Sequence, residues 1–170
     1  MRIFIHIEFS NALNDTFFGQ LDRCFEHLGY LPGDYCQGFS NKDSKWVDVV
    51  WKNRAIAALE LLTLKCEYLY SSKSDWDTIW VELPCKRSLP HLLVLNTSHD
   101  FGYNNSFTKY EKDQALRIEA LALSLHKTLN ANDTAAWSDY HLSEGGEPWF
   151  RFSKEEWKPL GELPIEKTDV

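Results

Sequence analysis

The N-terminal segment alternates between apolar and more polar side chains, and this alternation restricts the folds open to the chain. Ile3, Ile5, Ile7 and Phe9 occupy every second position, which is the two-residue period of a β-strand with one buried face. Such a strand needs neighbouring strands and a layer of apolar side chains over its buried face. The pattern therefore predicts a sheet and excludes an entirely helical fold.

Two segments have clear helical signals. Asn14 or Asp15 can serve as the N-cap residue of a helix that continues to about residue 28. The apolar spacing over residues 110–129 predicts the longest helix, and we expect Leu116 and Leu123 on its buried face. These helices would supply the layer that covers the sheet.

A third segment, residues 54–70, carries two competing patterns. One set of apolar residues follows helical spacing, and another set alternates as in a strand. Its alanine-rich start favours a helix by intrinsic propensity, so we predict a helix there. Residues 31–45 are rich in turn residues and are predicted as a loop. The remaining strands are predicted at residues 46–51, 78–83, 92–95, 137–142 and 149–152.

The order of these elements predicts an α+β fold. A chain of 170 residues has the usual size of one domain, so we expect a single domain over residues 1–170. Its core would be one mixed β-sheet, with about three helices packed mainly on one face. The apolar strand at residues 92–95 is expected in the middle of the sheet. The chain from about residue 158 is expected to form a loosely held tail.

The net charge of −7 excludes several classes of partner. An acidic chain is not attracted to phosphate groups, so we predict no direct binding to nucleic acid and none to membranes. No secretory signal or membrane-spanning stretch is recognisable, which predicts a cytoplasmic protein with reduced cysteines. The four cysteines lack the spacing of a zinc site, so neither a metal nor a cofactor is expected.

Aromatic residues among carboxylates form the candidate binding site. Residues 133–170 carry nine acidic and four basic side chains, a balance of −5, and an Asp-Trp-Asp segment lies at residues 75–77. Tryptophan and tyrosine provide desolvated anchors at protein interfaces, while carboxylates steer and pair a basic partner. The alternative is that the rings pack into the core and the acids only solvate it. The candidate contact residues are Asp75, Trp76, Asp77, Asp139, Tyr140, Glu144, Glu147 and Trp149.

The outer positions of the predicted strands give a second indication of a binding surface. They include His6, Glu8, Asp48, Trp80 and Glu82, which lie opposite the apolar alternation. If those strands are neighbours, these residues form an acidic patch that contains a tryptophan. If they are not, the residues are an ordinary solvated sheet surface.

The alternative function is a small cytoplasmic hydrolase-like enzyme that uses His99 and nearby carboxylates. His99 follows a predicted strand and could act as a general base, with Ser98, Asp100 or His91 as neighbours. Adjacent residues rarely form the hydrogen bonds of a catalytic triad, and these residue types are also common in turns. The sequence has no nucleophile-elbow, phosphate-loop or zinc-protease motif. We therefore predict no catalytic residues and no enzymatic activity.

Over its whole length, the chain resembles the bacterial immunity proteins that neutralise polymorphic or contact-dependent toxins. The shared profile is a short, acidic, aromatic-rich chain that forms one cytoplasmic domain. This group has many folds, so the resemblance implies a function and no particular architecture or binding residue. It implies a non-enzymatic inhibitor that binds a basic toxin domain, such as a nuclease, and blocks its active site.

Overall fold

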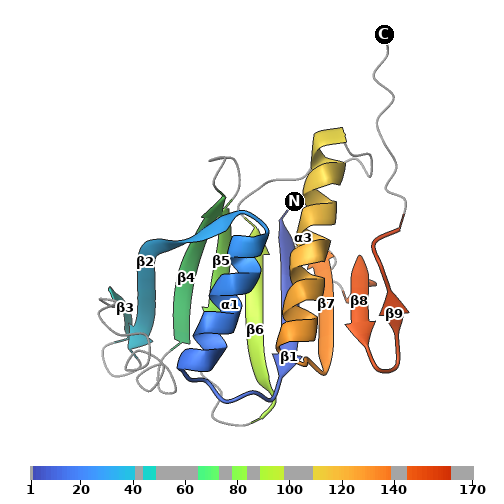
Figure 1. The fold of residues 1–170 in the computed structure, drawn as a ribbon. Coiled ribbons are helices and arrows are strands. Elements are labelled where there is room, and N and C mark those ends of the chain that lie inside the picture. Colours follow the sequence, from blue (N-terminus) through green and yellow to red (C-terminus); the bar gives the residue numbers. More distant parts are fainter. Residues whose placement is uncertain are drawn as a thin grey trace.

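Nine strands and two helices make up the described part of the chain (Figure 1). The structure is a computed structural model, and the residues that it describes are 2–40, 44–48, 65–72, 78–83, 89–97, 109–138 and 145–161. The strands are β1 (Ile3–Phe9), β2 (Tyr30–Ser40), β3 (Lys45–Asp48), β4 (Lys65–Ser72), β5 (Thr78–Leu83), β6 (His91–Thr97), β7 (Asp133–Ser138), β8 (Phe150–Ser153) and β9 (Trp157–Lys158). The helices are α1 (Asp15–His27) and α3 (Lys109–Thr128).

The strands form one sheet in the order β3-β2-β4-β5-β6-β1-β7-β8-β9. The N-terminal strand β1 lies between β6 and β7, where Ile5 is opposite Leu95 on one side and Ala136 on the other. The strand predicted at residues 78–83 is confirmed as β5. The apolar strand predicted at residues 92–95 is part of β6, and its place inside the sheet is also confirmed.

The prediction of a mixed sheet is wrong, because every neighbouring pair of strands in this order is antiparallel. A helix that connects two adjacent strands usually makes them parallel. Here α1 connects β1 to β2 and α3 follows β6 and precedes β7, yet neither pair of strands is adjacent in the sheet. Strand β1 is inserted between β6 and β7, so each of them pairs with it in the antiparallel direction.

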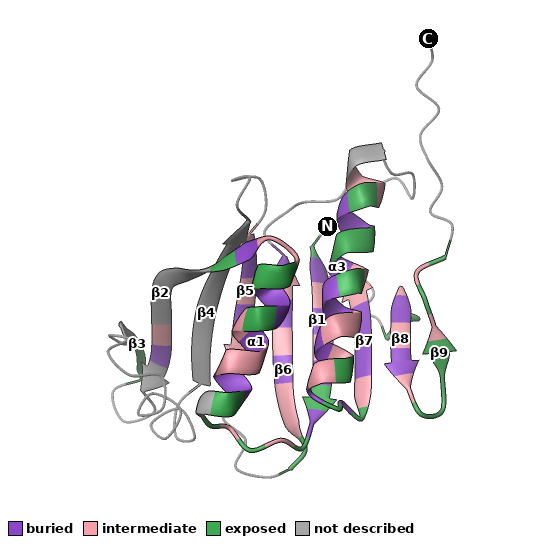
Figure 2. Cartoon of the chain, in the orientation of Figure 1, coloured by how far each residue is buried: buried purple, intermediate pink, exposed green. Residues whose placement is uncertain are grey.

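The core lies between the two helices and the face of the sheet that they cover (Figure 2). Helix α1 buries Phe17, Leu21 and Phe25 against the sheet. The Asn14 side chain caps the helix, because its Oδ1 atom accepts a hydrogen bond from the Phe17 backbone N–H at 3.1 Å. Gly29 follows the helix with a φ of 88°, which suits a glycine at a helix end. The helix predicted over residues 15–28 is confirmed.

Helix α3 is also confirmed, but its predicted buried face is wrong. Leu116 is 42% exposed, and Leu123 is only partly buried. Apolar residues cover a broad arc of this helix, so the spacing alone does not show which part of the arc faces the sheet. The residues of α3 that face the sheet are shifted by one position along the sequence from the predicted ones. These buried residues are Ala115, Ile118, Leu121, Ala122, Leu125 and Leu129.

Two segments fold as strands where the sequence predicted other structure. The predicted loop over residues 31–45 is largely β2, and the end of the predicted helix over residues 54–70 is β4. In β2, the pairing register shifts between Pro32 and Cys36, and such an irregularity accommodates the proline and glycine that suggested a loop. Strand β4 pairs with β2 and β5, so tertiary pairing overrides helix propensity there.

The remaining predicted elements agree with the structure in part. Strand β3 begins one residue before the predicted strand at 46–51, and β7 begins four residues before the predicted strand at 137–142. Residues 49–51, 54–64 and 139–142 lie outside the described residues. The described residues therefore hold two helices rather than about three.

The C-terminal part of the described chain packs against α3 and the core. Trp157 lies against Phe152 with ring centroids 4.8 Å apart, and the Leu160 backbone N–H donates a hydrogen bond to the Glu119 side chain. Leu160 also packs against the core. The tail predicted from about residue 158 otherwise consists of residues 162–170, which lie outside the described residues.

Candidate functional site

The predicted contact residues fall mostly outside the part of the chain that the structure describes. Glu147 is described, and its highly exposed carboxylate pairs with the Lys158 ammonium at 3.0 Å. Trp149 is also described, and it is partly buried against the core. The contact residues outside the described part are Asp75, Trp76, Asp77, Asp139, Tyr140 and Glu144. The catalytic candidates Ser98, His99 and Asp100 lie outside it as well, whereas His91 is on β6.

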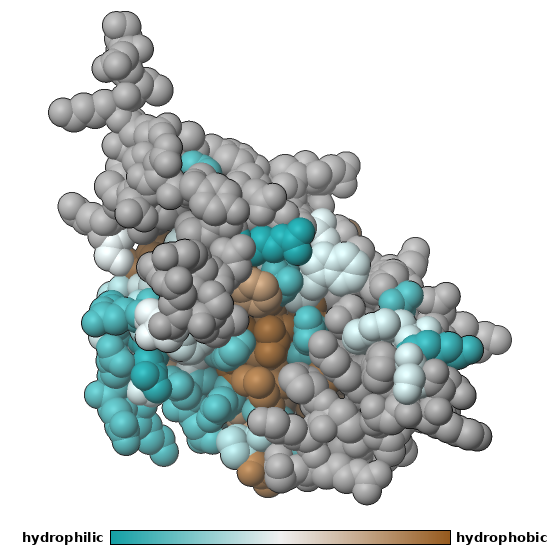
Figure 3. All heavy atoms as spheres, turned by 180° about the vertical axis from the view of Figure 1, so that it is seen from behind, coloured by the Kyte–Doolittle hydropathy of each residue, from teal (hydrophilic) through white to brown (hydrophobic). Residues whose placement is uncertain are grey.

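The face of the sheet opposite α1 and α3 carries the best-defined candidate surface. No helix among the described residues covers this face, which we call the open face (Figure 3). Its side chains come from every second strand position, because successive residues of a strand point to opposite faces. On the central strands these residues are Phe4, His6, Glu8, Trp80, Glu82, Leu92, Val94, Asn96, Ala135 and Trp137. Figure 3 shows apolar residues along the middle of this face and hydrophilic residues toward β8 and β9.

One row across the open face is mainly aromatic. Asn96 on β6 lies opposite Trp80 on one side and Phe4 on the other, and Phe4 lies opposite Trp137 on β7. We call these four residues the aromatic row. All of them are partly buried, so their side chains still reach solvent. The carbonyl oxygen of the Asn96 side chain is buried and has no hydrogen-bond partner in the structure.

The next row along the strands combines His6 with carboxylates. His6 and Glu82 each lie opposite Val94, and Glu82 also lies opposite Glu67 on β4. The His6 ring is 5.3 Å from the Trp137 ring, measured between centroids. Burial lowers the pKa of His6, while the carboxylates of Glu8 and Glu82 act in the opposite direction. The surroundings of His6 therefore favour the neutral form of its ring, although the carboxylates of Glu8 and Glu82 act on it.

The basic residues at the β8–β9 side of this face are paired within the chain. Arg151 donates hydrogen bonds of 3.0 and 2.9 Å to the two carboxylate oxygens of Asp133, and it lies 3.6 Å from Glu156. These hydrogen bonds raise the pKa of Arg151. Lys158 pairs with Glu147, as described above. Carboxylates thus compensate the charges of Arg151 and Lys158.

The structure brings together only some of the residues predicted from the outer strand positions. His6, Glu8 and Glu82 interact electrostatically, although β6 separates β1 from β5. Asp48 is on β3, at the far edge of the sheet. Sequence reasoning did not place Asn96 and Trp137 on this surface, because their position beside Phe4 and Trp80 depends on the strand order. The alternation of each strand identified the correct face, but it could not identify neighbours.

The aromatic row lies near the end of the sheet from which two segments outside the described residues continue the chain. Residues 73–77 connect β4 to β5, and the register pairs Ser71 with Thr78 at that end. Residues 139–144 follow β7, whose last residue Ser138 lies opposite Ile3 at the same end. The chain therefore leaves β4 and β7 at the end of the sheet that carries Trp80 and Trp137.

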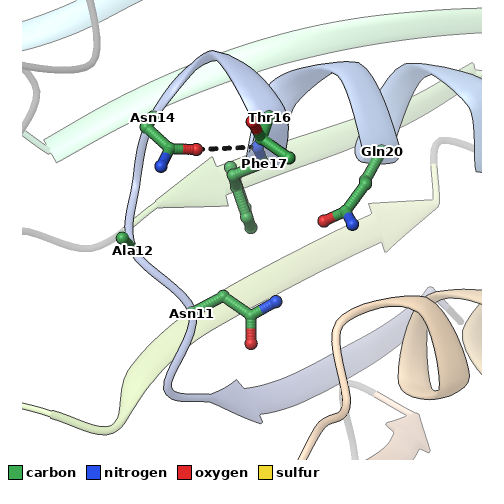
Figure 4. A pocket seen from close by; sticks show the side chains of 6 residues that line it. All are labelled: Asn11, Ala12, Asn14, Thr16, Phe17 and Gln20. Carbon is green, nitrogen blue, oxygen red and sulfur yellow. Dashed lines mark hydrogen bonds between the residues drawn. The ribbon is translucent and has the colours of Figure 1, made fainter.

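A hollow of about 320 Å³ lies at the start of α1 (Figure 4). Its lining residues are Asn11, Ala12, Asn14, Thr16, Phe17 and Gln20. None of these side chains titrates near neutral pH, and the Asn14 amide oxygen is used to cap the helix. The hollow therefore lacks the groups that acid–base catalysis needs.

The described residues contain no group of three or more His, Cys, Asp or Glu side chains that could hold a metal ion. Neither α1 nor α3 combines the length and the apolar character that a helix needs to cross a bilayer.

The chain resembles a solved structure of a bacterial protein, and the likeness is distant. No family model matches the sequence, and no curated protein matches it. The solved structure is the T6SS protein PA0821 from Pseudomonas aeruginosa, with a TM-score of 0.41 and 15% sequence identity. The match covers 79% of this chain and 39% of that chain, so this chain spans well under half the length of its structural neighbour.

Two histidines make stability depend on pH. Burial lowers the pKa of both His6 and His126, and Nδ1 of His126 lies 3.0 Å from the Thr134 hydroxyl. As the pH falls below about 6.5, the unfolded chain binds protons before the folded chain does. We therefore expect the melting temperature to fall between about pH 7 and the lowered pKa values. The double variant His6→Gln, His126→Gln should show a smaller fall. An equally steep fall in that variant would assign the pH dependence to other groups.

Proposed function

We propose that the protein is a non-enzymatic inhibitor of the immunity type. It binds a basic protein in the cytoplasm and neutralises it, and it needs no cofactor or metal for this function. A toxin domain with nuclease activity fits this role best, because a surface that holds phosphate groups must be basic. The acidic inhibitor occupies that surface and excludes the nucleic acid.

The observation that carries the proposal is the composition of the open face. The rings of Phe4, Trp80 and Trp137 lie on the same face of the sheet as Glu8 and Glu82. Rings that are partly exposed supply most of the binding energy of a protein interface when a partner buries them. Carboxylates around them add attraction for a basic partner and raise its association rate. This combination supports a protein-binding surface better than it supports an active site.

In this proposal, the contact residues that were predicted from the sequence belong to the same binding surface. Asp75, Trp76 and Asp77 lie between β4 and β5 in the sequence, and the chain leaves β4 at the end of the sheet that carries the aromatic row. Asp139, Tyr140 and Glu144 follow β7 at the same end, and Glu147 and Trp149 precede β8. A partner that covers the aromatic row from this end would reach these residues too.

The hydrolase alternative has no comparable support. It depends on His99 and nearby carboxylates, and no observation on the described residues favours it. His91, the described member of that group, lies with its ring centroid 5.5 Å from that of Phe9. We therefore keep the inhibitor as the proposed function.

The test uses the C-terminal domain of the protein encoded immediately upstream of this chain's gene. Immunity proteins act on a toxin, and a large secreted protein with a variable C-terminal domain is the expected neighbour. We expect the two purified proteins to form a stable complex in which the domain loses its toxic activity. A domain that stays fully active with excess inhibitor present would contradict the proposal.

A further inference from the structure

A histidine lies at the centre of the open face, and we infer that this residue, His6, couples the binding of the partner to pH. The partner binds the open face tightly while the imidazole ring of His6 is neutral and less tightly once the ring is protonated. The inference rests on the proposed function and specifies how the same surface is regulated. It depends on the position of the ring, on the charges around it and on the change that a basic partner makes to both.

The His6 ring lies where a partner on the open face covers it. His6 is on the central strand β1, opposite Val94 on β6 and opposite Ala135 on β7. Its ring is tilted by 59° to the Trp137 ring, with the two centroids 5.3 Å apart. Because Trp137 belongs to the aromatic row, a partner that covers the row also reaches His6. His6 is only partly buried in the free protein, so binding removes the water that still reaches it.

The charged groups that act on the His6 ring are carboxylates. Glu8 is two residues further along β1, and Glu82 on β5 lies opposite the same valine of β6 as His6 does. On β7, Asp133 lies opposite Glu8 and is hydrogen-bonded to Arg151 of β8. The residues of β6 on this face are uncharged, namely Leu92, Val94 and Asn96. In the free protein, burial lowers the pKa of His6 in spite of the two carboxylates that favour its charged form.

A basic partner shifts this balance further toward the neutral ring. Loss of water around the ring disfavours the imidazolium, and the positive charges of the partner repel it. Both effects lower the pKa of His6 in the complex below its value in the free protein. As the pH falls, the free protein therefore binds a proton at His6 before the complex does, and this proton opposes binding. Carboxylates titrate near pH 4, so Glu8 and Glu82 stay charged while His6 titrates.

The first experiment measures the affinity for the upstream-encoded domain by calorimetry at about pH 7.5, 6.5 and 5.5. One proton is involved, so we expect the wild-type affinity to fall by up to about tenfold for each pH unit below the pKa of His6 in the free protein. His6→Gln keeps a neutral polar side chain and should lose most of this fall. The matched control is His126→Gln, because burial also lowers the pKa of His126, whose ring lies near Trp157 on the helix side. An equal fall in His6→Gln and the wild type would overturn the inference.

The second experiment follows the wild-type protein and does not depend on the folding of a variant. An NMR titration of the histidine ring protons gives the pKa of His6 in the free protein and in the complex. The signal that is missing from the spectrum of His6→Gln identifies the residue. We expect a lower pKa in the complex than in the free protein. An equal or higher pKa in the complex would contradict the inference, because protonation of His6 would then leave binding unchanged or strengthen it.

The two proposals fail in different ways. The absence of a complex at all three pH values would reject the inhibitor, and the role of His6 with it. A complex that forms with the same affinity at all three pH values, and leaves the pKa of His6 unchanged, would reject the role of His6 and keep the inhibitor.

Discussion

Replacing Leu121 by alanine is expected to lower the free energy of unfolding by about 2–5 kcal/mol. Leu121 is fully buried on α3, in the stripe that faces the sheet. The substitution removes apolar contacts and leaves a cavity that the surrounding core fills only in part. Chemical unfolding in urea, with fluorescence of the tryptophans as the signal, measures the change.

The matched control is Leu116→Ala on the same helix. Leu116 is 42% exposed, so we expect its replacement to change the free energy of unfolding by no more than about 0.5 kcal/mol. Both variants change the same residue type in the same helix, so differences in helix propensity cancel. A larger loss for Leu116→Ala than for Leu121→Ala would show that the helix packs through the face predicted from the sequence.

The contrast between these leucines shows what the sequence predicts well and what it does not. Helix α3 was predictable because its apolar spacing is long and unambiguous. Its buried face was not, because apolar residues cover more of the helix surface than the sheet can contact. The face depends on how α3 sits against α1 and the sheet, which local spacing does not encode.

The same distinction applies to the sheet. Strands β1 and β5 were predicted with their correct bounds, since each alternates strictly between buried and partly exposed residues. Strand β4 was predicted as a helix, because its two periods conflict and only the pairing with β2 and β5 decides between them. The antiparallel direction of every neighbouring pair depends on the strand order. That order comes from long-range pairing such as β1 with β7.

For the candidate site, the sequence identified the residue types and one of the surfaces. The outer positions of β1 and β5 were predicted to carry His6, Glu8, Trp80 and Glu82, and the structure places them on the open face. Asn96 belongs to the strand-end segment that includes His99, but its place opposite Phe4 and Trp80 depends on the strand order.

The second large effect is expected at the interface. We expect Trp80→Ala to weaken binding to the upstream-encoded domain at least about 30-fold, which corresponds to about 2 kcal/mol. Trp80 is a partly buried ring on the open face, and a partner that covers it gains a large apolar contact. Isothermal titration calorimetry measures the affinity, and thermal melting checks that the variant is folded.

The control for this prediction is Trp157→Ala. Trp157 is 57% exposed, but its ring lies near His126 of α3, on the helix side of the sheet. We expect this variant to bind like the wild type. A folded Trp80→Ala that also binds like the wild type would remove the open face from the interface.

The contact residues predicted from the sequence are tested by the same titration and by stopped-flow measurement of the association rate. We expect Trp76→Ala to weaken the complex strongly, and Asp75→Ala and Glu147→Ala mainly to slow association. Trp149 packs against the core, so its alanine variant is interpreted together with its melting temperature. Wild-type affinity and association rate in all four variants, Trp149→Ala included, would exclude both predicted clusters from the interface.

The salt dependence of association tests the central claim most directly. An acidic inhibitor and a basic partner attract each other over a distance of about one Debye length, which added salt shortens. The measurement is the association rate constant of the wild-type protein with the upstream-encoded domain, at about 50 and about 300 mM salt. The proposed function predicts a one-to-one complex that forms markedly more slowly at the higher concentration. Association that is unchanged or faster at high salt would contradict it.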